Sequence, residues 1–317
     1  MSLCVSAPGK MMIAGEYAVL HGAEALVAAV SRRARLTLDA EREVQAELPP
    51  EVQAARALAE ARLGPVAGTL SLDVSELRAG DSKLGLGSSS AAAAAAAGIV
   101  HAAHGRDLQA PEVRAQVLHD ALAGHRSIAP EGSGADVAAA VLGGFVRFVR
   151  GSSPGADPET RLLTWPQAVA LKVVWTGKAV RTSDMLAQVA ELRARDAASH
   201  DRCMEAIADE AARLLSALGA NDTSGVVSGF ERHAEAMAAL GRAAGIPIVD
   251  DTTQAVRELA RRHGGAAKPS GAGGGDVVLA VFDDPGRAES FEGGCTAAQF
   301  SVLSITVGDV GERVEVL

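Results

Sequence analysis

The segment most suited to chemistry is a glycine- and serine-rich turn at residues 83–91, which reads Lys-Leu-Gly-Leu-Gly-Ser-Ser-Ser-Ala. Glycines let the backbone turn sharply and approach a ligand closely. The serines then begin a long alanine-rich stretch that predicts a helix, whose first N–H groups have no partner within the helix. Together with the positive end of the helix dipole, these groups make an anion site suited to phosphates. The alternative is a serine N-cap on an ordinary helix.

The serine hydroxyls at this turn can also ligate Mg²⁺, a hard cation that prefers oxygen. The turn is not a Walker motif, because neither Gly9-Lys10 nor Gly177-Lys178 fits the pattern G-x-x-x-x-G-K-[ST]. The H-R-D signature of protein kinases is also missing. A phosphate-binding chain with this sequence therefore needs a different framework.

Charge and composition exclude several classes of function. The 317 residues carry a formal net charge of -9, so the sequence has no basic footprint for nucleic acid and no basic block typical of a membrane-surface segment. The three cysteines are scattered and lack metal-ligand spacing, which indicates free thiols in a reducing compartment. No signal-peptide pattern and no apolar run of roughly 18–20 residues is present. We therefore expect a cytoplasmic protein without a nucleic-acid or membrane partner.

The elements that must position the turn can be predicted from periodicity and punctuation. The first 40 residues predict β structure, and helices are expected at residues 50–64, 88–104, 111–125, 183–197, 201–218, 222–243 and 252–263. Further strands are expected at residues 69–77, 143–149, 168–176, 277–282 and 299–307. A Gly/Ser/Pro-rich stretch at 151–160 indicates a domain boundary. This order predicts an α+β architecture with domains at residues 1–160 and 161–317.

Three segments resemble, in the right order, the three motifs of the GHMP kinases, the superfamily of galactokinase, homoserine kinase, mevalonate kinase and phosphomevalonate kinase. The first is Ala-Pro-Gly-Lys at 7–10 with Gly-Glu-Tyr-Ala-Val at 15–19, the second is Gly-Leu-Gly-Ser-Ser at 85–89, and the third is Lys-Pro-Ser-Gly-Ala-Gly-Gly-Gly-Asp at 268–276. The resemblance implies a two-domain GHMP kinase fold, with a left-handed βαβ-type phosphate loop in the N-terminal domain and a ferredoxin-like C-terminal domain. It also implies a small-molecule kinase that uses ATP and Mg²⁺, as a monomer or homodimer.

A fourth segment, Gly-Ser-Gly-Ala-Asp-Val-Ala at 132–138, resembles the stretch that carries the catalytic aspartate of these kinases. The resemblance implies that Asp136 is the general base and that Lys10 lies beside it. Phosphoryl transfer needs positioning, charge neutralisation and a group that can take a hydroxyl proton, which a carboxylate next to an ammonium can supply. Without the resemblance, Asp136 is read as a helix cap and Lys10 as a surface lysine.

The resemblance also implies which residues contact the ligands. The nucleotide is expected to contact Lys83, Gly85, Leu86, Gly87, Ser88, Ser89, Ser90, Gly271, Ala272, Gly273 and Gly274. The acceptor substrate is expected to contact Lys10, Glu16, Tyr17, Ser133, Gly134, Asp136, Lys178, Arg181, Ser270 and Gly271. Ser89 is the expected metal ligand, because His125 stands where mevalonate kinases usually have a Mg²⁺-ligating glutamate, and Glu131 is an alternative carboxylate nearer in sequence.

Several details resemble phosphomevalonate kinases in particular. Lys83 precedes the GLGSS loop, the first motif has Gly-Glu-Tyr, and Trp-Thr-Gly-Lys stands at 175–178. This implies transfer of phosphate from ATP to 5-phosphomevalonate, giving 5-diphosphomevalonate in the mevalonate route to isoprenoids. A phosphorylated acceptor would explain Lys83, Lys178 and Arg181 as phosphate contacts, the alternative being solvated surface charge.

Three other functions stay open. Residues 20–26 resemble the corresponding stretch of mevalonate kinases, so mevalonate kinase is an alternative. Diphosphomevalonate decarboxylase is another, although the third motif of those enzymes usually departs from the Gly-Ala-Gly-Gly-Gly found here. The last is a small-molecule-binding relative that has lost activity, against which the presence of Lys10 and Asp136 argues.

Overall fold

The computed structural model of the chain describes residues 2–39, 47–153 and 155–315. These form two compact units, one from Met1–Met11, Val27–Leu162 and Thr306–Leu317, and the other from Met12–Leu26 and Leu163–Ile305. The chain enters the second unit within β1 (Ser2–Ala14) and returns to the first within β2 (Ala25–Asp39). The division at residue 160 stays a prediction. Met1 and Ala40 of the first predicted β region and Pro154 of the predicted boundary stretch lie outside the described residues.

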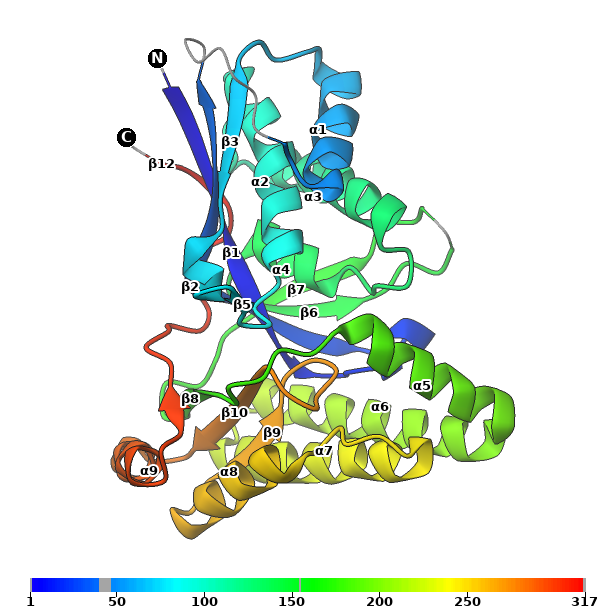
Figure 1. Ribbon diagram of the computed structural model, residues 1–317, viewed down its shortest axis with the longest axis vertical. Coiled ribbons are helices and arrows are strands. Elements are labelled where there is room, and N and C mark those ends of the chain that lie inside the picture. Colours follow the sequence, from blue (N-terminus) through cyan, green and yellow to red (C-terminus); the bar gives the residue numbers. More distant parts are fainter. Residues whose placement is uncertain (1, 40–46, 154, 316–317) are drawn as a thin grey trace. The chain divides into compact units, whose positions relative to one another are not determined.

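The first unit is built on a six-stranded sheet in the order β12-β1-β2-β6-β7, with β3 pairing the outer part of β2. Its other strands are β3 (Thr69–Asp73), β6 (Phe145–Val149), β7 (Glu159–Leu163) and β12 (Arg313–Glu315). A small hairpin, β4 (Arg78–Ala79) and β5 (Ser82–Lys83), follows the 3-10 turn η2 (Ser75–Leu77). Four helices cover one face of the sheet (Figure 1): α1 (Pro50–Leu63), α2 (Ser88–Ala103), α3 (Pro111–Ile128) and α4 (Ala135–Leu142).

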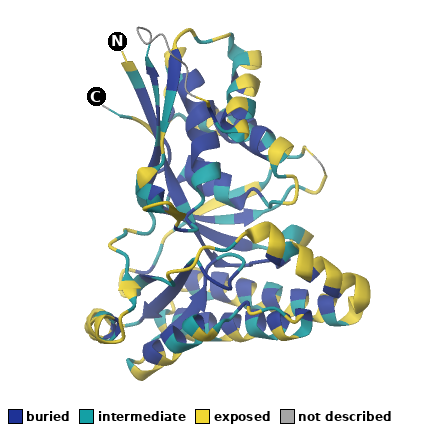
Figure 2. Cartoon of the chain, in the orientation of Figure 1, coloured by how far each residue is buried: buried dark blue, intermediate teal, exposed yellow. Residues whose placement is uncertain are grey.

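The alanine run of α2 makes this helix the centre of the layer. Every residue from Ser90 to His101 is buried, as the dark colour of α2 in Figure 2 shows. Small side chains allow close helix packing on several sides, and alanine has the highest helix propensity. Glycine serves the same end between α1 and α3, where a Cβ at Gly124 would lie 2.5 Å from the Cα atom of Ala55. The backbones of α1 and α3 therefore meet closely beside α2.

The second unit contains a four-stranded antiparallel sheet in the order β11-β8-β10-β9. The strands are β8 (Ala170–Trp175), β9 (Ala266–Pro269), β10 (Val277–Phe282) and β11 (Ser301–Val302). Its helices are α5 (Thr182–Arg195), α6 (Ala197–Gly219), α7 (Thr223–Ala244), α8 (Asp251–Arg262) and α9 (Pro285–Ala297), with the 3-10 turn η1 (Ala18–His21) from the N-terminal segment. The succession strand, helices, two strands, helix, strand confirms the expected ferredoxin-like arrangement.

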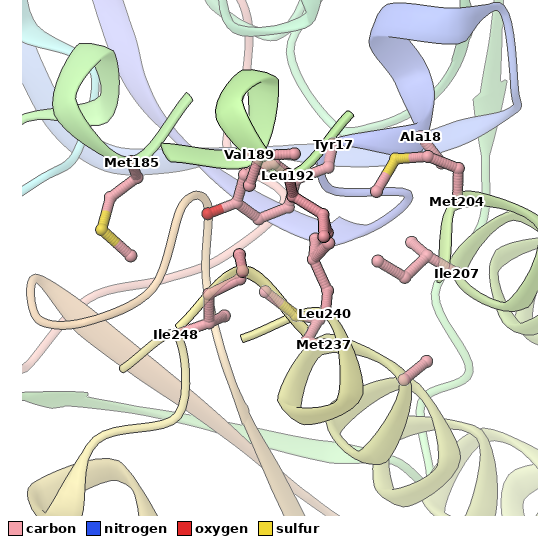
Figure 3. Packing of buried hydrophobic residues seen from close by; sticks show 12 residues of the cluster. Tyr17, Ala18, Met185, Val189, Leu192, Met204, Ile207, Met237, Leu240 and Ile248 are labelled. Carbon is pink, nitrogen blue, oxygen red and sulfur yellow. The ribbon is translucent and has the colours of Figure 1, made fainter. Parts of the chain in front are cut away.

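Methionine, leucine and isoleucine side chains fill the core between α5, α6 and α7 (Figure 3). Tyr17 and Ala18 of the N-terminal segment belong to the same cluster, as does Ile248 from the turn after α7. Burying such side chains is the main stabilising contribution to a fold. The core therefore holds the segment after β1 and the turn after α7 in one packed body.

The structure corrects several predicted elements. The strand expected at 69–77 ends at Asp73 and gives way to η2, and only Ser301–Val302 of the strand expected at 299–307 pairs. Helices α4 and α9 were not predicted. The first is short, and the second contains Gly293 and Gly294, which weaken the helical signal. Among residues 2–39, 47–153 and 155–315, no helix is long and apolar enough to cross a bilayer.

Candidate functional site

The predicted phosphate loop lies at the N-terminus of α2 in the first unit. Gly85 and Gly87 have positive φ angles of 75° and 74°, a conformation that only glycine adopts freely. Gly87 is the N-cap residue, and it has no side chain to cap the helix, so the first N–H groups of α2 are not occupied by a cap. Leu84 and Leu86 are buried and anchor the loop to the core. This geometry suits the binding of an anion at the end of a long helix.

Lys10 lies directly across this loop. Its backbone N–H donates to the Leu86 carbonyl at 2.8 Å, which fixes β1 beside the loop. Its aliphatic chain crosses Gly87, where a Cβ would lie 2.9 Å from Lys10 Cγ. Glycine at 87 is therefore needed twice, for the backbone conformation and for the space that the lysine occupies. The half-buried Lys10 side chain adds a positive charge to the anion site.

Asp136 lies in the first turn of α4, after the left-handed Gly134. The Ser90 hydroxyl donates a hydrogen bond to Asp136 Oδ2, and the Val137 N–H donates to Oδ1 at 3.0 Å. Burial acts to raise the pKa of Asp136, but the charges of His125 and Lys10 and the two hydrogen bonds together lower the pKa below its usual range. The carboxylate is therefore ionised at neutral pH and shares its surroundings with Lys10.

Ser89 meets two side chains that come from other helices. Its hydroxyl donates to Glu51 Oε1 of α1 at 2.8 Å, and its Oγ lies 3.4 Å from His125 Nε2 of α3. Glu131, the carboxylate considered from the sequence, is exposed, whereas Glu51 was not considered. Contact between residues 51 and 89 depends on helix packing, and the only local signal was a glutamate at the start of a predicted helix.

Oxygen ligands are available here for Mg²⁺. No group of three or more His, Cys, Asp or Glu residues able to hold a metal occurs within the described part of the chain. Magnesium in nucleotide sites usually has only one or two protein carboxylates, its other ligands being phosphate oxygens and water. The Ser89 hydroxyl and the Glu51 carboxylate at the end of the phosphate loop fit that ligand set.

Other predicted residues of the first unit lie around these groups. Lys83 is exposed on β5, just before the loop. Ser133 precedes α4, and its Oγ accepts a hydrogen bond from the Ala135 N–H at 3.2 Å. The structure thus brings together, within one unit, the predicted residues Lys10, Gly85 to Ser90, Ser133, Gly134 and Asp136.

The third motif forms a turn in the second unit between β9 and β10. Gly271, Gly273 and Gly274 have positive φ angles, and the Gly274 N–H donates to the Ile248 carbonyl at 2.9 Å. A Cβ at Gly273 would lie 2.3 Å from that same carbonyl oxygen. The glycines therefore let this loop lie against the turn that follows α7.

The loop is also tied to the N-terminal segment. The Tyr17 hydroxyl donates to the Ala272 carbonyl at 2.5 Å, and Ser270 Oγ both accepts from the Met12 N–H at 2.9 Å and donates to the Met12 carbonyl at 3.0 Å. Tyr17 has φ 61° and ψ -54°, and the Ala18 N–H donates to the Glu16 carbonyl two residues earlier at 2.7 Å. This is a strained γ-turn, held by the surrounding contacts. Ser270 and Tyr17 thus anchor the loop.

Glu16 was expected to contact substrate, but its carboxylate is fully buried and engaged. It accepts from Lys268 Nζ at 2.5 Å and lies 2.7 Å from His233 Nε2. Burial acts to raise the pKa of Glu16, yet the charges of Lys268 and His233 lower it to about 2. Burial also lowers the pKa of Lys268, whose ammonium lies 6.0 Å from the centre of the Phe230 ring. Glu16 is thus paired with Lys268, the first residue of the third motif, and its contact with substrate stays a prediction.

Lys178 and Arg181 are exposed in the segment between β8 and α5. The Asp276 N–H, at the end of the third motif, donates to the Lys178 carbonyl at 2.7 Å, and the Val180 N–H donates to Asp276 Oδ1 at 3.2 Å. A Cβ at Gly275 would lie 2.7 Å from the Lys178 carbonyl oxygen. The backbone of the predicted Lys178 segment is thus packed on the third motif, while its basic side chains remain in solvent.

Comparison with known proteins matches both halves of the chain to one family. Residues 52–144 match the GHMP kinases N terminal domain, and residues 214–298 match the GHMP kinases C terminal model. The phosphomevalonate kinase of Streptomyces sp. strain CL190 is 29% identical over 337 residues, covering 87% of this chain and 89% of the relative. The mevalonate kinase of Archaeoglobus fulgidus is 30% identical over 302 residues, covering 88% of this chain and 92% of the relative.

A solved structure agrees in fold over nearly the same length. The Streptococcus pneumoniae phosphomevalonate kinase in complex with phosphomevalonate and AMPPNP has a TM-score of 0.83, with 18% sequence identity. The match covers 96% of this chain and 99% of that structure. The fold is therefore shared over nearly the whole length of both proteins.

Proposed function

Because the chain belongs to the GHMP kinase family, whose members similar to it are small-molecule kinases, we propose that it transfers the γ-phosphoryl group of ATP to 5-phosphomevalonate. The bond between the γ-phosphorus and the oxygen that bridges to the β-phosphate breaks, and its electron pair leaves with ADP. A new bond forms between the γ-phosphorus and a terminal oxygen of the acceptor phosphate. The products are ADP and 5-diphosphomevalonate.

The hydrogen bond from Ser90 to Asp136, beside Lys10, is the observation that carries this proposal. It places a carboxylate and an ammonium at the N-terminus of α2, where phosphates are favoured. Lys10 stabilises charge on the transferring group, and Asp136 orients the acceptor and balances the lysine. The backbone from Gly85 to Ser90 holds the nucleotide phosphates, and Mg²⁺, when bound at Ser89, neutralises part of their charge.

The pKa of Asp136 bears on the choice of acceptor. A carboxylate whose pKa lies below its usual range is a weak base. A phosphate monoester has its second pKa near 6, so its terminal oxygens are mostly ionised at neutral pH and need no base to attack. A hydroxyl acceptor does need one. The lowered pKa fits an Asp136 that acts mainly by orienting the acceptor and by its charge.

The contacts of the acceptor are part of the same proposal. We assign the phosphate group of the acceptor to Lys178 and Arg181, which are exposed and basic. We assign its other polar groups to Ser133 and the Gly134 backbone. Lys83, the exposed lysine before the loop, serves the nucleotide phosphates. Gly271 to Gly274 contribute the nucleotide contacts of the second unit. We further propose that the enzyme works in the cytoplasm on small molecules alone.

Mevalonate is the second candidate acceptor, because two mevalonate kinases, at 27% and 30% identity, also match nearly the full chain. A coupled ADP-release assay with Mg²⁺-ATP, given mevalonate, 5-phosphomevalonate and 5-diphosphomevalonate separately, distinguishes the candidates. Turnover with 5-phosphomevalonate alone is the expected result. Turnover with mevalonate instead would keep the phosphoryl-transfer chemistry and reverse the acceptor, and no turnover with any of the three would contradict the proposal.

A further inference from the structure

The geometry points to Glu51 as a ligand of the nucleotide-bound Mg²⁺, acting with Ser89 from a helix that the motifs of the sequence do not include. This inference rests on the proposed function, since it concerns the metal that accompanies ATP. The Glu51 carboxylate lies 2.8 Å from the Ser89 hydroxyl, at the start of the helix that carries the phosphate loop. It is thus a hard oxygen ligand at the position where the phosphates are expected.

Helix packing explains how a carboxylate from α1 reaches the loop. Gly124 of α3 admits the backbone of α1 at Ala55, with 2.5 Å between Ala55 Cα and the position of a Cβ on Gly124. Glu51 lies one turn before Ala55 on α1, and His125 directly follows Gly124 on α3. Both side chains therefore meet Ser89, from two helices that approach each other closely.

The nature of His125 explains why a carboxylate from another helix is needed at Ser89. An imidazole is a poor ligand for Mg²⁺, which prefers oxygen, so the side chain on α3 does not supply the carboxylate that the cation needs. Glu51 supplies it from α1, on the same serine hydroxyl. Glu51 and Ser89 would supply the protein ligands of the cation, whose charge would offset that of the nucleotide phosphates.

A structural reading of Glu51 must be separated from this one. Glu51 stands in the first turn of α1, where an acidic residue stabilises the helix dipole, and its bond to Ser89 could serve only to join two helices. Glu112 provides a matched control. It follows Pro111 in the first turn of α3 as Glu51 follows Pro50 in α1, and it is exposed.

The test measures binding of the non-hydrolysable analogue AMPPNP by calorimetry, once with Mg²⁺ and once with EDTA. Wild-type protein is expected to bind more tightly with Mg²⁺. Glu51→Gln should lower the apparent Mg²⁺ affinity of the complex about 10–100-fold while leaving the affinity in EDTA unchanged. Glu112→Gln should keep the full Mg²⁺ effect. Loss of affinity in EDTA by the same factor as in Mg²⁺ would show a merely structural role and overturn the inference.

Two further variants extend the test, and the first of them does not depend on the folding of Glu51→Gln. Ser89→Ala should reduce the same Mg²⁺ effect, since it removes the other oxygen. The double variant Glu51→Gln with His125→Glu returns a carboxylate to Ser89 from the opposite helix, and it should recover part of the Mg²⁺ effect. If folded Glu51→Gln gains as much AMPPNP affinity from Mg²⁺ as the wild type does, this inference is overturned and the proposed function is not affected. Wild-type protein that binds no AMPPNP under either condition overturns the proposed function and this inference with it.

Discussion

Ser90 and Asp136 come from the first turns of two different helices, α2 and α4, and the Ser90 hydroxyl donates a hydrogen bond to the Asp136 carboxylate. Both helices begin at a glycine in the left-handed conformation, Gly87 and Gly134. Two helix N-termini therefore lie together, and each favours negative charge. This hydrogen bond holds the Asp136 carboxylate at the phosphate loop. Ser90 is therefore a positioning residue and not only a residue of the first helical turn.

Replacing Asp136 with Asn tests this arrangement. We expect Asp136→Asn to lower turnover about 10²–10⁴-fold, because the charge that orients the acceptor and balances Lys10 is lost while the size is kept. Affinity for AMPPNP should change little. Ser90→Ala should lower turnover less, since it removes one hydrogen bond and leaves the carboxylate. Turnover is measured by coupled ADP release, with Asp157→Asn, an exposed aspartate, as the control. Turnover of Asp136→Asn at the wild-type rate would contradict the assigned role.

The contact between Gly87 and Lys10 gives a second prediction. Alanine at position 87 would have to keep the left-handed backbone conformation of Gly87, which costs about 1–2 kcal/mol. Its Cβ would also lie 2.9 Å from Lys10 Cγ. Gly105 has φ +71° and nothing within 4 Å of its added Cβ, so Gly105→Ala carries the backbone cost alone. In urea titrations we expect Gly87→Ala to lose at least as much unfolding free energy as Gly105→Ala, because only the former also crowds Lys10. Only Gly87→Ala should lose turnover. Equal turnover in the two variants would contradict a role for Lys10 in the reaction.

Much of the fold could be predicted because local signals were strong. Proline at the start and glycine at the end marked α1, the alanine run marked α2, and long amphipathic patterns marked α5 to α8. Helix α9 could not be predicted, because Gly293 and Gly294 interrupt it. Its few apolar residues form no helical pattern and become a recognisable face only where they pack on the sheet. Phe291 and Cys295 are buried in the core around β10, a contact that the sequence does not display.

The candidate site was predictable where a motif is contiguous and not where it depends on packing. The loop at 85–90 and Asp136 could be named from short segments. Glu51 could not, because it meets Ser89 only through the close approach of α1, α2 and α3. Lys268 was visible as the first residue of the third motif, yet its role as the buried partner of Glu16 depends on two segments 252 residues apart.

Lys178 offers a test of the acceptor. Its side chain is exposed, so Lys178→Ala should leave the midpoint of urea unfolding almost unchanged. If Lys178 contacts the phosphate group of the acceptor, KM for 5-phosphomevalonate should rise about tenfold or more. Hydrogen bonds to charged groups contribute about 1.5–3 kcal/mol. KM for ATP should stay constant. Lys172→Ala on β8 is the control for lost positive charge, because Lys172 pairs with Glu292. Equal rises in KM for both substrates would place Lys178 on the nucleotide instead.

Two buried glutamates should respond to acid in opposite directions. The pKa of Glu16 is lowered to about 2 by Lys268 and His233, whereas burial raises the pKa of Glu312 well above its usual value. Neither oxygen of Glu312 has a hydrogen-bond partner among the described residues, and Gly98 leaves room for its carboxyl group on α2. Glu16 therefore stabilises the fold above about pH 4.5, and this contribution is lost as the pH falls toward 2. The contribution of Glu312 is present at low pH and is lost as the pH rises through its raised pKa.

Urea unfolding of two single variants, measured from pH 7 down to about pH 2.5, checks these signs. Glu16→Gln should lower the unfolding free energy by about 3–5 kcal/mol at pH 7, since it leaves the Lys268 charge buried without its partner. The deficit should shrink as the pH falls, because the wild type loses its own advantage in acid. Glu312→Gln should instead equal or exceed the wild-type stability at pH 7 and lose that advantage in acid, because the wild-type carboxyl group is then neutral as well. Parallel pH dependences in the two variants would contradict the opposite ionisation states assigned to these carboxyl groups.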